Sequence, residues 1–230
     1  MKRDFEMIRT LPSCTTFFIA SCLFLFSAKF AFSSEDASFE ALNLPSDIEF
    51  LTANSDIYLY IYADPTCLFC KSLHKSITKL LNSTNVNIVY RFFSLSPDSV
   101  KSKSLVSALY CSKLLLSKYQ QKRVVNSFYS LAHLPNISPE AIISSSFLKV
   151  GFKNRSALDS CLGSNQIGRN VVENISRNKA MGIVRTPTLV LWDNKLGRAV
   201  IREGNLPEEK IKVLLNEESA RALLNQYTMR

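Results

Sequence analysis

Two cysteines three positions apart, Cys67 and Cys70, are the residues of this sequence best suited to chemistry. They follow the apolar run 57–62 and open a stretch with helical periodicity. At the start of a helix, unpaired backbone N–H groups and the positive end of the helix dipole favour the thiolate of the first cysteine. Because a thiolate is the form that attacks disulfides, the pair predicts thiol–disulfide exchange with other proteins.

In the predicted reaction, Cys67 is the nucleophile, and Cys70, one helical turn further on, releases the bound client. Leu68 and Phe69 between them add an apolar, aromatic surface beside the thiolate. The alternative for an isolated pair of this spacing is half of a zinc site with four ligands. The other cysteines do not repeat the spacing, and neither histidine lies near them in sequence. We therefore predict no metal and no cofactor, since the redox-active disulfide itself carries the electrons.

The elements around the cysteine pair follow a recognisable order. Residues 57–62 predict a strand by their β-branched and aromatic side chains, and residues 86–93 predict a second strand. Between them, apolar residues at helical spacing predict a helix over 67–81. A strand–helix–strand unit of this kind is normally a parallel crossover.

A block of predicted helices, spanning about residues 97–181, separates this unit from a second group of elements. That group is a hairpin of two strands (188–192 and 198–202) and a last helix that begins near Leu206. Without the block, the order is that of the thioredoxin fold, which places a Cys-x-x-Cys motif directly after the first strand. The sequence therefore predicts an α/β protein, a thioredoxin fold with a helical insertion between the second and third strands.

Thr186 and Pro187 stand at the start of the first hairpin strand. A proline there cannot donate to the ladder, so an ordinary strand entry would explain it. We favour a cis Thr186–Pro187 peptide bond, because in this fold the turn faces the Cys-x-x-Cys motif. Such a turn would leave backbone groups of Arg185 or Thr186 free to pair with an extended client.

Asp64, Phe69 and His74 are candidate modulators of the cysteine pair. Asp64 either tightens the turn before Pro65 or influences proton transfer at Cys70. His74 lies four residues beyond Cys70 on the same predicted helix, and a surface side chain is the default interpretation.

The predicted thioredoxin-like domain covers residues 56–226. Residues 34–55 are short and polar, and we expect them to form a lead-in rather than a domain. Residues 1–33 have a basic start, a ten-residue apolar run (17–26) and small residues at the end, which indicates a signal peptide. The alternative is a retained membrane anchor, although the run is short of the roughly 20 residues that span a bilayer.

The charge pattern gives no sign of nucleic-acid binding. The formal net charge is +9, but the basic residues are scattered and form no block interleaved with aromatic residues. A solvated basic surface explains this charge.

Export to an oxidising compartment would leave four cysteines in the mature chain, which predict two disulfides in one of three pairings. The short spacing pairs Cys67 with Cys70, which leaves Cys111 for a structural disulfide with Cys161. The alternative is that Cys111 is a small core residue of an apolar helix.

Residues 62–70 (Tyr-Ala-Asp-Pro-Thr-Cys-Leu-Phe-Cys), followed by His74, resemble the active-site segment of the bacterial periplasmic DsbC/DsbG disulfide isomerases. Thr186 and Pro187 are similar to the Thr–cis-Pro turn of those proteins. DsbA-like oxidases share the helical insertion, so the resemblance covers residues 56–226 at the level of the superfamily.

The resemblance implies an exported thiol–disulfide oxidoreductase, either an isomerase or reductase like DsbC and DsbG or an oxidase like DsbA. Its partners would be exported proteins that contain cysteines and a membrane redox protein. The isomerases have an N-terminal dimerisation domain, whereas here only residues 34–55 lie between the predicted signal peptide and the first predicted strand, which argues against dimerisation and against true isomerase activity.

Two other classes remain as alternatives. A binding or assembly module could keep the thioredoxin fold without using the cysteine pair. A copper-delivery protein of the same fold would need a further histidine near the later strands, and no histidine follows His133.

Overall fold

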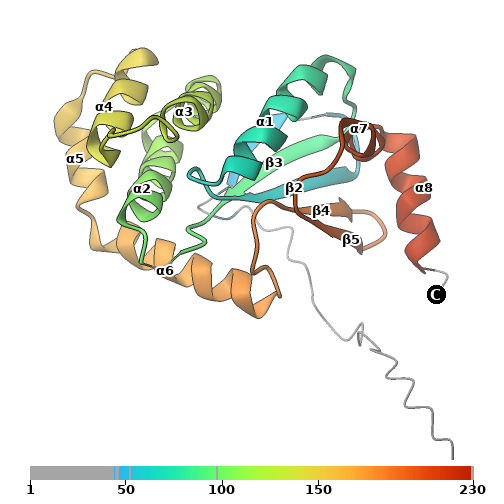
Figure 1. Cartoon of the computed structure of the whole chain (residues 1–230). Helices are drawn as coiled ribbons and strands as arrows, with labels where there is room; N and C mark the ends of the chain where they lie inside the picture. The colour runs from blue at the N-terminus through green and yellow to red at the C-terminus, as the bar shows by residue number, and fades with distance from the viewer. Residues whose placement is uncertain (1–43, 45–46, 52, 97, 229–230) are drawn as a thin grey trace, which may run out of the picture. The chain divides into compact units, whose positions relative to one another are not determined.

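A mixed β-sheet lies at the centre of the described part of the chain (Figure 1). The computed structural model describes residues 44, 47–51, 53–96 and 98–228. The strands of the sheet are β1 (Asp47–Leu51), β2 (Ile57–Ala63), β3 (Asn87–Phe92), β4 (Thr188–Asp193) and β5 (Arg198–Glu203). They lie in the order β1-β3-β2-β4-β5.

The pairing of β2 with β3 is parallel, as the strand–helix–strand pattern predicted. The pairs β1–β3, β2–β4 and β4–β5 are antiparallel. Central strand β2 is apolar along its length, and Ile57, Leu59 and Ile61 are fully buried. Cys67 follows the end of this strand, so the most deeply buried part of the fold positions the cysteine pair.

In chain order, one helix connects the parallel strands, five form the insertion and two follow the last strand. They are α1 (Leu68–Leu80) with a 3₁₀ turn (Leu81–Ser83), α2 (Val100–Leu115), α3 (Lys118–Leu131), α4 (Pro139–Lys149), α5 (Arg155–Leu162), α6 (Asn165–Ala180), α7 (Glu208–Leu215) and α8 (Glu217–Thr228). Helix α1 connects β2 to β3, and α2 to α6 stand between β3 and β4. The fold class predicted from the sequence, a thioredoxin fold with a helical insertion, is confirmed.

The insertion forms its own helical layer beside the sheet (Figure 1). Helix α2 packs against α3, α4, α5 and α6, and α3 also contacts β1. Outside the insertion, α1 contacts α7, while α8 contacts β5, β4 and β2. The start of α1 therefore lies where the sheet and the inserted helices meet.

Strand β1 was not predicted, because the segment before residue 56 is short and polar. Ile48 and Phe50 of β1 enter the main hydrophobic core. On the other face, Asp47 forms an ion pair with Arg91 of β3 at 2.8 Å, with both side chains buried. The sheet therefore begins inside the segment that the sequence analysis treated as a lead-in.

The C-terminal helix also differs from the prediction. One helix was expected from Leu206 onward, but Asn216 has an extended backbone (φ −101°, ψ 123°) and separates α7 from α8. The Asn216 side chain accepts a hydrogen bond from the backbone N–H of Ser219 at 3.0 Å. It thereby pairs one of the N–H groups that the start of α8 leaves unpaired.

Gly182 ends α6 as predicted, with a φ of +74° that side-chain-bearing residues rarely adopt. The backbone N–H of Ile183 then donates to the carbonyl of Asn178 at 2.8 Å. This reversal turns the chain from α6 into the loop that carries Thr186 and Pro187.

The predicted signal peptide, residues 1–33, lies outside the described residues. Among the helices that the structure describes, none is both long and apolar enough to cross a membrane.

Candidate active site

Cys67 lies at the boundary between the turn after β2 and helix α1. Its backbone is extended, and its N–H donates to the carbonyl of Asp64 at 3.1 Å. Its sulfur caps the helix by accepting a hydrogen bond from the backbone N–H of Cys70 at 3.3 Å. The thiol thus pairs one of the donors that a helix N-terminus leaves unsatisfied.

These contacts favour the ionised form of Cys67. The pKa of Cys67 is lowered from 9.0 to about 6, above all because the Cys70 side chain donates a hydrogen bond to its sulfur. Burial opposes this effect, while Thr186 and the backbone N–H groups of Phe69 and Cys70 lower the pKa further. The first turn of α1 contains no acidic residue that would work against the thiolate. At neutral pH, Cys67 is therefore largely ionised.

Cys70 lies in the opposite environment. Its side chain is 1% exposed and belongs to the main hydrophobic core. Burial raises the pKa of the Cys70 thiol, and the neighbouring Cys67 raises it further. Cys70 therefore stays protonated when Cys67 is ionised, and the two free thiols are chemically distinct. This arrangement can supply an attacking thiolate at the surface and a resolving thiol beneath it.

The loop from α6 to β4 brings Thr186 and Pro187 to the cysteine pair. The peptide bond between them is cis, the alternative that the sequence analysis favoured. The Cys67 thiol donates to the carbonyl of Thr186 at 3.5 Å. The carbonyl of Arg185 accepts from the Thr188 hydroxyl at 2.9 Å. The carbonyls of Arg185 and Thr186, which were expected to be free for a client, thus both accept hydrogen bonds within the chain. A Cys67 thiolate has no proton to donate, however, so ionisation of Cys67 would free the Thr186 carbonyl.

Apolar side chains project beside the thiol. Leu68 and Phe69 are 68% and 64% exposed, and Val184, two residues before Thr186, is 54% exposed. The residues that flank Cys67 and Thr186 in sequence thus present apolar side chains to solvent.

Asp64 holds the turn in front of Cys67. One carboxylate oxygen accepts from the backbone N–H and the hydroxyl of Thr66, at 2.8 and 2.7 Å. The other accepts from the backbone N–H of Leu95 at 2.9 Å and the Ser102 hydroxyl at 2.7 Å. The carboxylate therefore joins the turn to the loop after β3 and to the start of α2. With four donors in place, this geometry favours the turn-tightening alternative over proton transfer at Cys70.

His74 is buried, so the default interpretation of a surface side chain was wrong. It is 6% exposed and lies on the inner face of α1 with Cys70. Its Nδ1 lies 2.9 Å from the Tyr90 hydroxyl and its Nε2 lies 2.7 Å from Oδ1 of Asn126. The imidazole thus links α1 to β3 and to α3.

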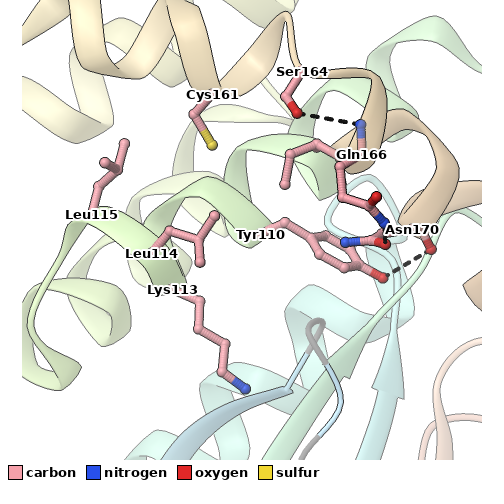
Figure 2. Close-up of a pocket in the computed structure, with 9 residues that line it drawn as sticks. Tyr110, Lys113, Leu114, Leu115, Cys161, Ser164, Gln166 and Asn170 are labelled. Atoms are coloured by element: carbon pink, nitrogen blue, oxygen red, sulfur yellow. Dashed lines mark hydrogen bonds between the residues drawn. The ribbon is translucent and has the colours of Figure 1, made fainter.

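Cys111 and Cys161 form a disulfide that joins α2 to α5. Cys161 also lines a largely apolar pocket of about 530 Å³ between α2 and the start of α6, which Figure 2 shows. At its wall, the Tyr110 hydroxyl donates to the backbone carbonyl of Asn170 at 3.3 Å. The pocket and the disulfide belong to the inserted helices and share no residue with the Cys67 site.

The described residues contain no group of three or more His, Cys, Asp and Glu side chains placed to hold a metal ion.

With this geometry established, the chain can be compared with known proteins. The sequence model of the thioredoxin family matches residues 52–217. The chain belongs to this family. No curated protein matches the sequence.

Solved structures of DsbA-like proteins share the fold of this family member. DsbA2 of Pseudomonas aeruginosa is 23% identical, with a TM-score of 0.59, over 74% of this chain and 93% of that one. A periplasmic thioredoxin-like protein from Salmonella enterica serovar Typhimurium is 13% identical, with a TM-score of 0.60, over 78% of this chain and 93% of that one. A variant of α-DsbA1 from Wolbachia pipientis is 18% identical, with a TM-score of 0.61, over 81% and 98%. The fold thus agrees with the superfamily that the motifs indicated, without selecting the DsbC/DsbG branch.

Sequence reasoning missed the residues that surround the buried half of the site. Ser102, Tyr90, Asn126 and Tyr129 lie on three elements and contact Asp64 or His74 only after folding. The sequence offers only a weak indication of these four residues, because a polar or aromatic residue on the inner side of a predicted strand or helix is a common pattern.

Proposed function

We propose that the protein is an exported thiol–disulfide oxidoreductase of the periplasm that exchanges disulfides with cysteine-containing exported proteins. One observation carries the proposal. Cys67 caps α1 and has a pKa lowered to about 6, while Cys70, one turn further, is buried and stays protonated. A structural cysteine pair has no need of this asymmetry, whereas a pair that must attack and then resolve a mixed disulfide depends on it.

The preferred direction follows from the stability of the Cys67 thiolate. Hydrogen bonds to the Cys67 sulfur stabilise the reduced protein and make this sulfur a good leaving group. We therefore propose that the oxidised protein donates its disulfide, as DsbA-like oxidases do. Isomerase or reductase action of the DsbC/DsbG type is the competing outcome.

Disulfide donation takes two steps. A client thiolate attacks the Cys67 sulfur, the Cys67–Cys70 bond breaks, and Cys70 leaves with the electron pair and takes up a proton. A second client thiolate then attacks the client sulfur of the mixed disulfide and expels Cys67 as a thiolate. The client loses two electrons, and the cysteine pair gains them.

The surface beside Cys67 suits clients that are not yet folded. Leu68, Phe69 and Val184 offer exposed apolar contacts. Once Cys67 is ionised or bonded to a client, the Thr186 carbonyl can accept from the backbone of an extended client strand. No cofactor is needed, and a membrane redox protein would reoxidise the pair.

Cysteine variants of the mature protein test this function. The oxidised wild-type protein, mixed with an unfolded client that has two thiols, should form the client disulfide. Cys67→Ser should abolish turnover. Reduced Cys70→Ser, offered a client disulfide instead of client thiols, should attack it through Cys67, release one client thiolate and accumulate the mixed disulfide. Full activity of Cys67→Ser in cells would instead identify a binding or assembly module.

Alkylation of free thiols in cells, read as a gel shift, tests the direction. A Cys67–Cys70 pair that is mostly oxidised supports disulfide donation, whereas a mostly reduced pair identifies an isomerase or reductase.

A further inference from the structure

Helix α1 carries positive charge as well as the cysteine pair. Lys71 lies in its first turn, where the backbone N–H donates to the carbonyl of Cys67 at 3.1 Å, and Lys75 lies one turn further. Among the described residues, the ion pairs of lysine involve Lys118 and Lys212 but neither of these two. Both ammonium groups are therefore available to a ligand.

The two lysines line a pocket between α1 and α3. Its volume is about 290 Å³, and Asn126 and Ser130 of α3 contribute to its lining. Lys75, Asn126 and Ser130 are exposed, so the pocket opens to solvent. A water molecule takes up about 30 Å³, so a space of this size holds a small side chain together with water.

A hydrogen bond inside the pocket determines which way the Asn126 amide points. Nε2 of His74 lies 2.7 Å from Oδ1 of Asn126, and Nδ1 lies 2.9 Å from the Tyr90 hydroxyl. An amide oxygen only accepts, so His74 donates to it and the NH₂ group of Asn126 is left for a ligand. Burial lowers the pKa of His74 to about 4, so the imidazole stays neutral and the lysines supply the charge.

The hydroxyl groups of the pocket are already engaged. The Thr78 hydroxyl donates to the carbonyl of His74 at 2.9 Å, and the Ser130 hydroxyl donates to the carbonyl of Asn126 at 2.8 Å. The described residues that line the pocket include no Asp or Glu. The donors available to a ligand are therefore two ammonium groups and one amide, a set that suits a carboxylate.

Little negative charge offsets the lysines. Between residues 65 and 139 the sequence has ten lysines and arginines but only one acidic residue, Asp98. Burial lowers the pKa of His133, at the end of α3, and the charges of Lys71 and Lys101 lower it further against a smaller opposing effect of Asp64. The positive potential therefore extends from the pocket along the side of the Cys67 site that the insertion forms.

The pocket lies within reach of a client bound at Cys67. Residues of an α-helix rise about 1.5 Å each, which places Lys71 about 6 Å and Lys75 about 12 Å along the axis from Cys67. An extended client covers about 3.3 Å per residue, so a side chain about two to four residues from the bonded client cysteine would reach the pocket.

We propose that the pocket between α1 and α3 binds an acidic side chain of the client, so that the protein prefers clients with an aspartate or glutamate near the reacting cysteine. The inference rests on the proposed function. Lys71 and Lys75 pair with the carboxylate, and the NH₂ group of Asn126 donates to it. The exposed apolar side chains of Leu68 and Phe69 accept many client sequences, whereas the charge of the pocket selects among them.

Peptides with a single cysteine test this preference on the oxidised wild-type protein. One peptide has aspartate three residues to each side of the cysteine, so either strand direction places an acid near the pocket, and its counterpart has asparagine at both positions. Mass spectrometry after an acid quench gives the rate of mixed-disulfide formation. Each rate is divided by that of the same peptide with the neutral disulfide 4,4′-dithiodipyridine, which removes the effect of charge on the peptide's own thiol.

We expect the aspartate peptide to react about fivefold faster than the asparagine peptide at low salt and about twofold faster in 0.5 M NaCl. Lys71→Gln/Lys75→Gln should remove the preference. The matched control, Lys79→Gln/Lys153→Gln, removes two exposed lysines outside the pocket and should keep it. Lys71 adjoins Cys70, but a change in the reactivity of the cysteine pair affects both peptides equally and cancels in the ratio.

The possible failures are distinct. If the oxidised wild-type protein reacts with neither peptide, the proposed function is wrong. If it reacts with both at the same corrected rate, or if the pocket variant keeps the preference or loses no more of it than the control variant, the carboxylate site is wrong and the function stands.

Discussion

The sulfur of Cys67 lies 3.5 Å from the carbonyl oxygen of Thr186, a residue 119 positions further along the chain. The helical insertion lies between these two residues in sequence. The reactive thiol therefore has a contact from the loop between α6 and β4, which follows the insertion. The Thr186 hydroxyl is buried and has no hydrogen-bond partner among the described residues. As a donor without a partner, it is available to a Cys67 thiolate, so it lowers the pKa of Cys67 and opposes the increase in the pKa of Cys70.

The first prediction concerns that hydroxyl. Thr186→Val keeps the shape of the side chain and removes the donor, so the pKa of Cys67 should rise above about 6. Titration of the thiolate absorbance near 240 nm measures the shift, and the rate of attack on a small disulfide at pH 6 should fall a few-fold. Thr188→Val, one residue beyond Pro187, is the matched control. An unchanged titration would show that the hydroxyl does not act on the thiolate.

The thiolate should also make the stability of the reduced protein depend on pH. The pKa of Cys67 is about 6 when folded and near 9.0 when unfolded, so ionisation favours the fold. This contribution is fully present above pH 9 and is lost as the pH falls through 6. Below pH 8, the raised pKa of Cys70 has little effect, which makes pH 5 to 8 the useful window.

Urea unfolding of reduced wild type and of Cys67→Ser measures this difference. The two should be similar at pH 5, and wild type should gain about 1–2 kcal/mol over the variant by pH 8, after allowance for solvent screening of a half-exposed group. Parallel curves across this range would contradict the lowered pKa.

Much of the site was predictable because it depends on local chemistry. The apolar strand before Cys67, the helical spacing after it and the glycine at the end of α6 are all readable within a few residues. The cis form of Thr186–Pro187 required one further premise, the order of the elements. These features determine the path of the backbone around Cys67, and the backbone N–H groups at the start of α1 help to stabilise its thiolate.

The missed features depend on partners that are distant in sequence. His74 could not be assigned to the interior, because its hydrogen-bond partner Asn126 lies 52 residues away on α3. Strand β1 has two acidic residues, Asp47 and Glu49, on one face. The burial of Asp47 is explained only by its ion pair with Arg91, which the sequence does not reveal. Polar residues that are buried in pairs defeat a prediction based on hydrophobic periodicity.

Asp64 gives the third prediction. Asp64→Asn replaces a carboxylate that accepts from four donors with an amide, whose NH₂ group would face donors instead. We expect a loss of about 2–4 kcal/mol in the free energy of unfolding, measured by urea denaturation. Asp98→Asn, at an exposed carboxylate before α2, should change stability by less than about 0.5 kcal/mol. Equal effects of the two substitutions would refute the role assigned to Asp64.

The disulfide of the helical block should stabilise the fold without taking part in exchange. Its cysteines are 50 residues apart, so its removal in Cys111→Ala/Cys161→Ser should cost about 2–4 kcal/mol. The urea midpoint should fall, while the rates at which Cys67 attacks a small aromatic disulfide and Cys70 then resolves the mixed disulfide stay at wild-type values at 20 °C. A folded double variant that no longer resolves the mixed disulfide would mean that this bond also takes part in the reaction.

The ion pair between Asp47 and Arg91 gives the last prediction, which concerns whether β1 belongs to the sheet. Arg91 donates to both carboxylate oxygens of Asp47, at 2.8 and 2.9 Å, and to the Tyr62 hydroxyl at 2.9 Å. Both charges are buried, so removing one leaves the other uncompensated. Arg91→Met or Asp47→Leu should therefore each cost about 3–5 kcal/mol in thermal or urea unfolding.

The double variant Arg91→Met/Asp47→Leu separates the pair from its surroundings. Replacing both charges with apolar side chains leaves no charge buried without its partner, so the double variant should be more stable than either single variant. This non-additivity requires β1 to lie beside β3, since the two residues are 44 positions apart in sequence. If the two single costs instead added up in the double variant, the charges would not meet and β1 would not be the edge of the sheet.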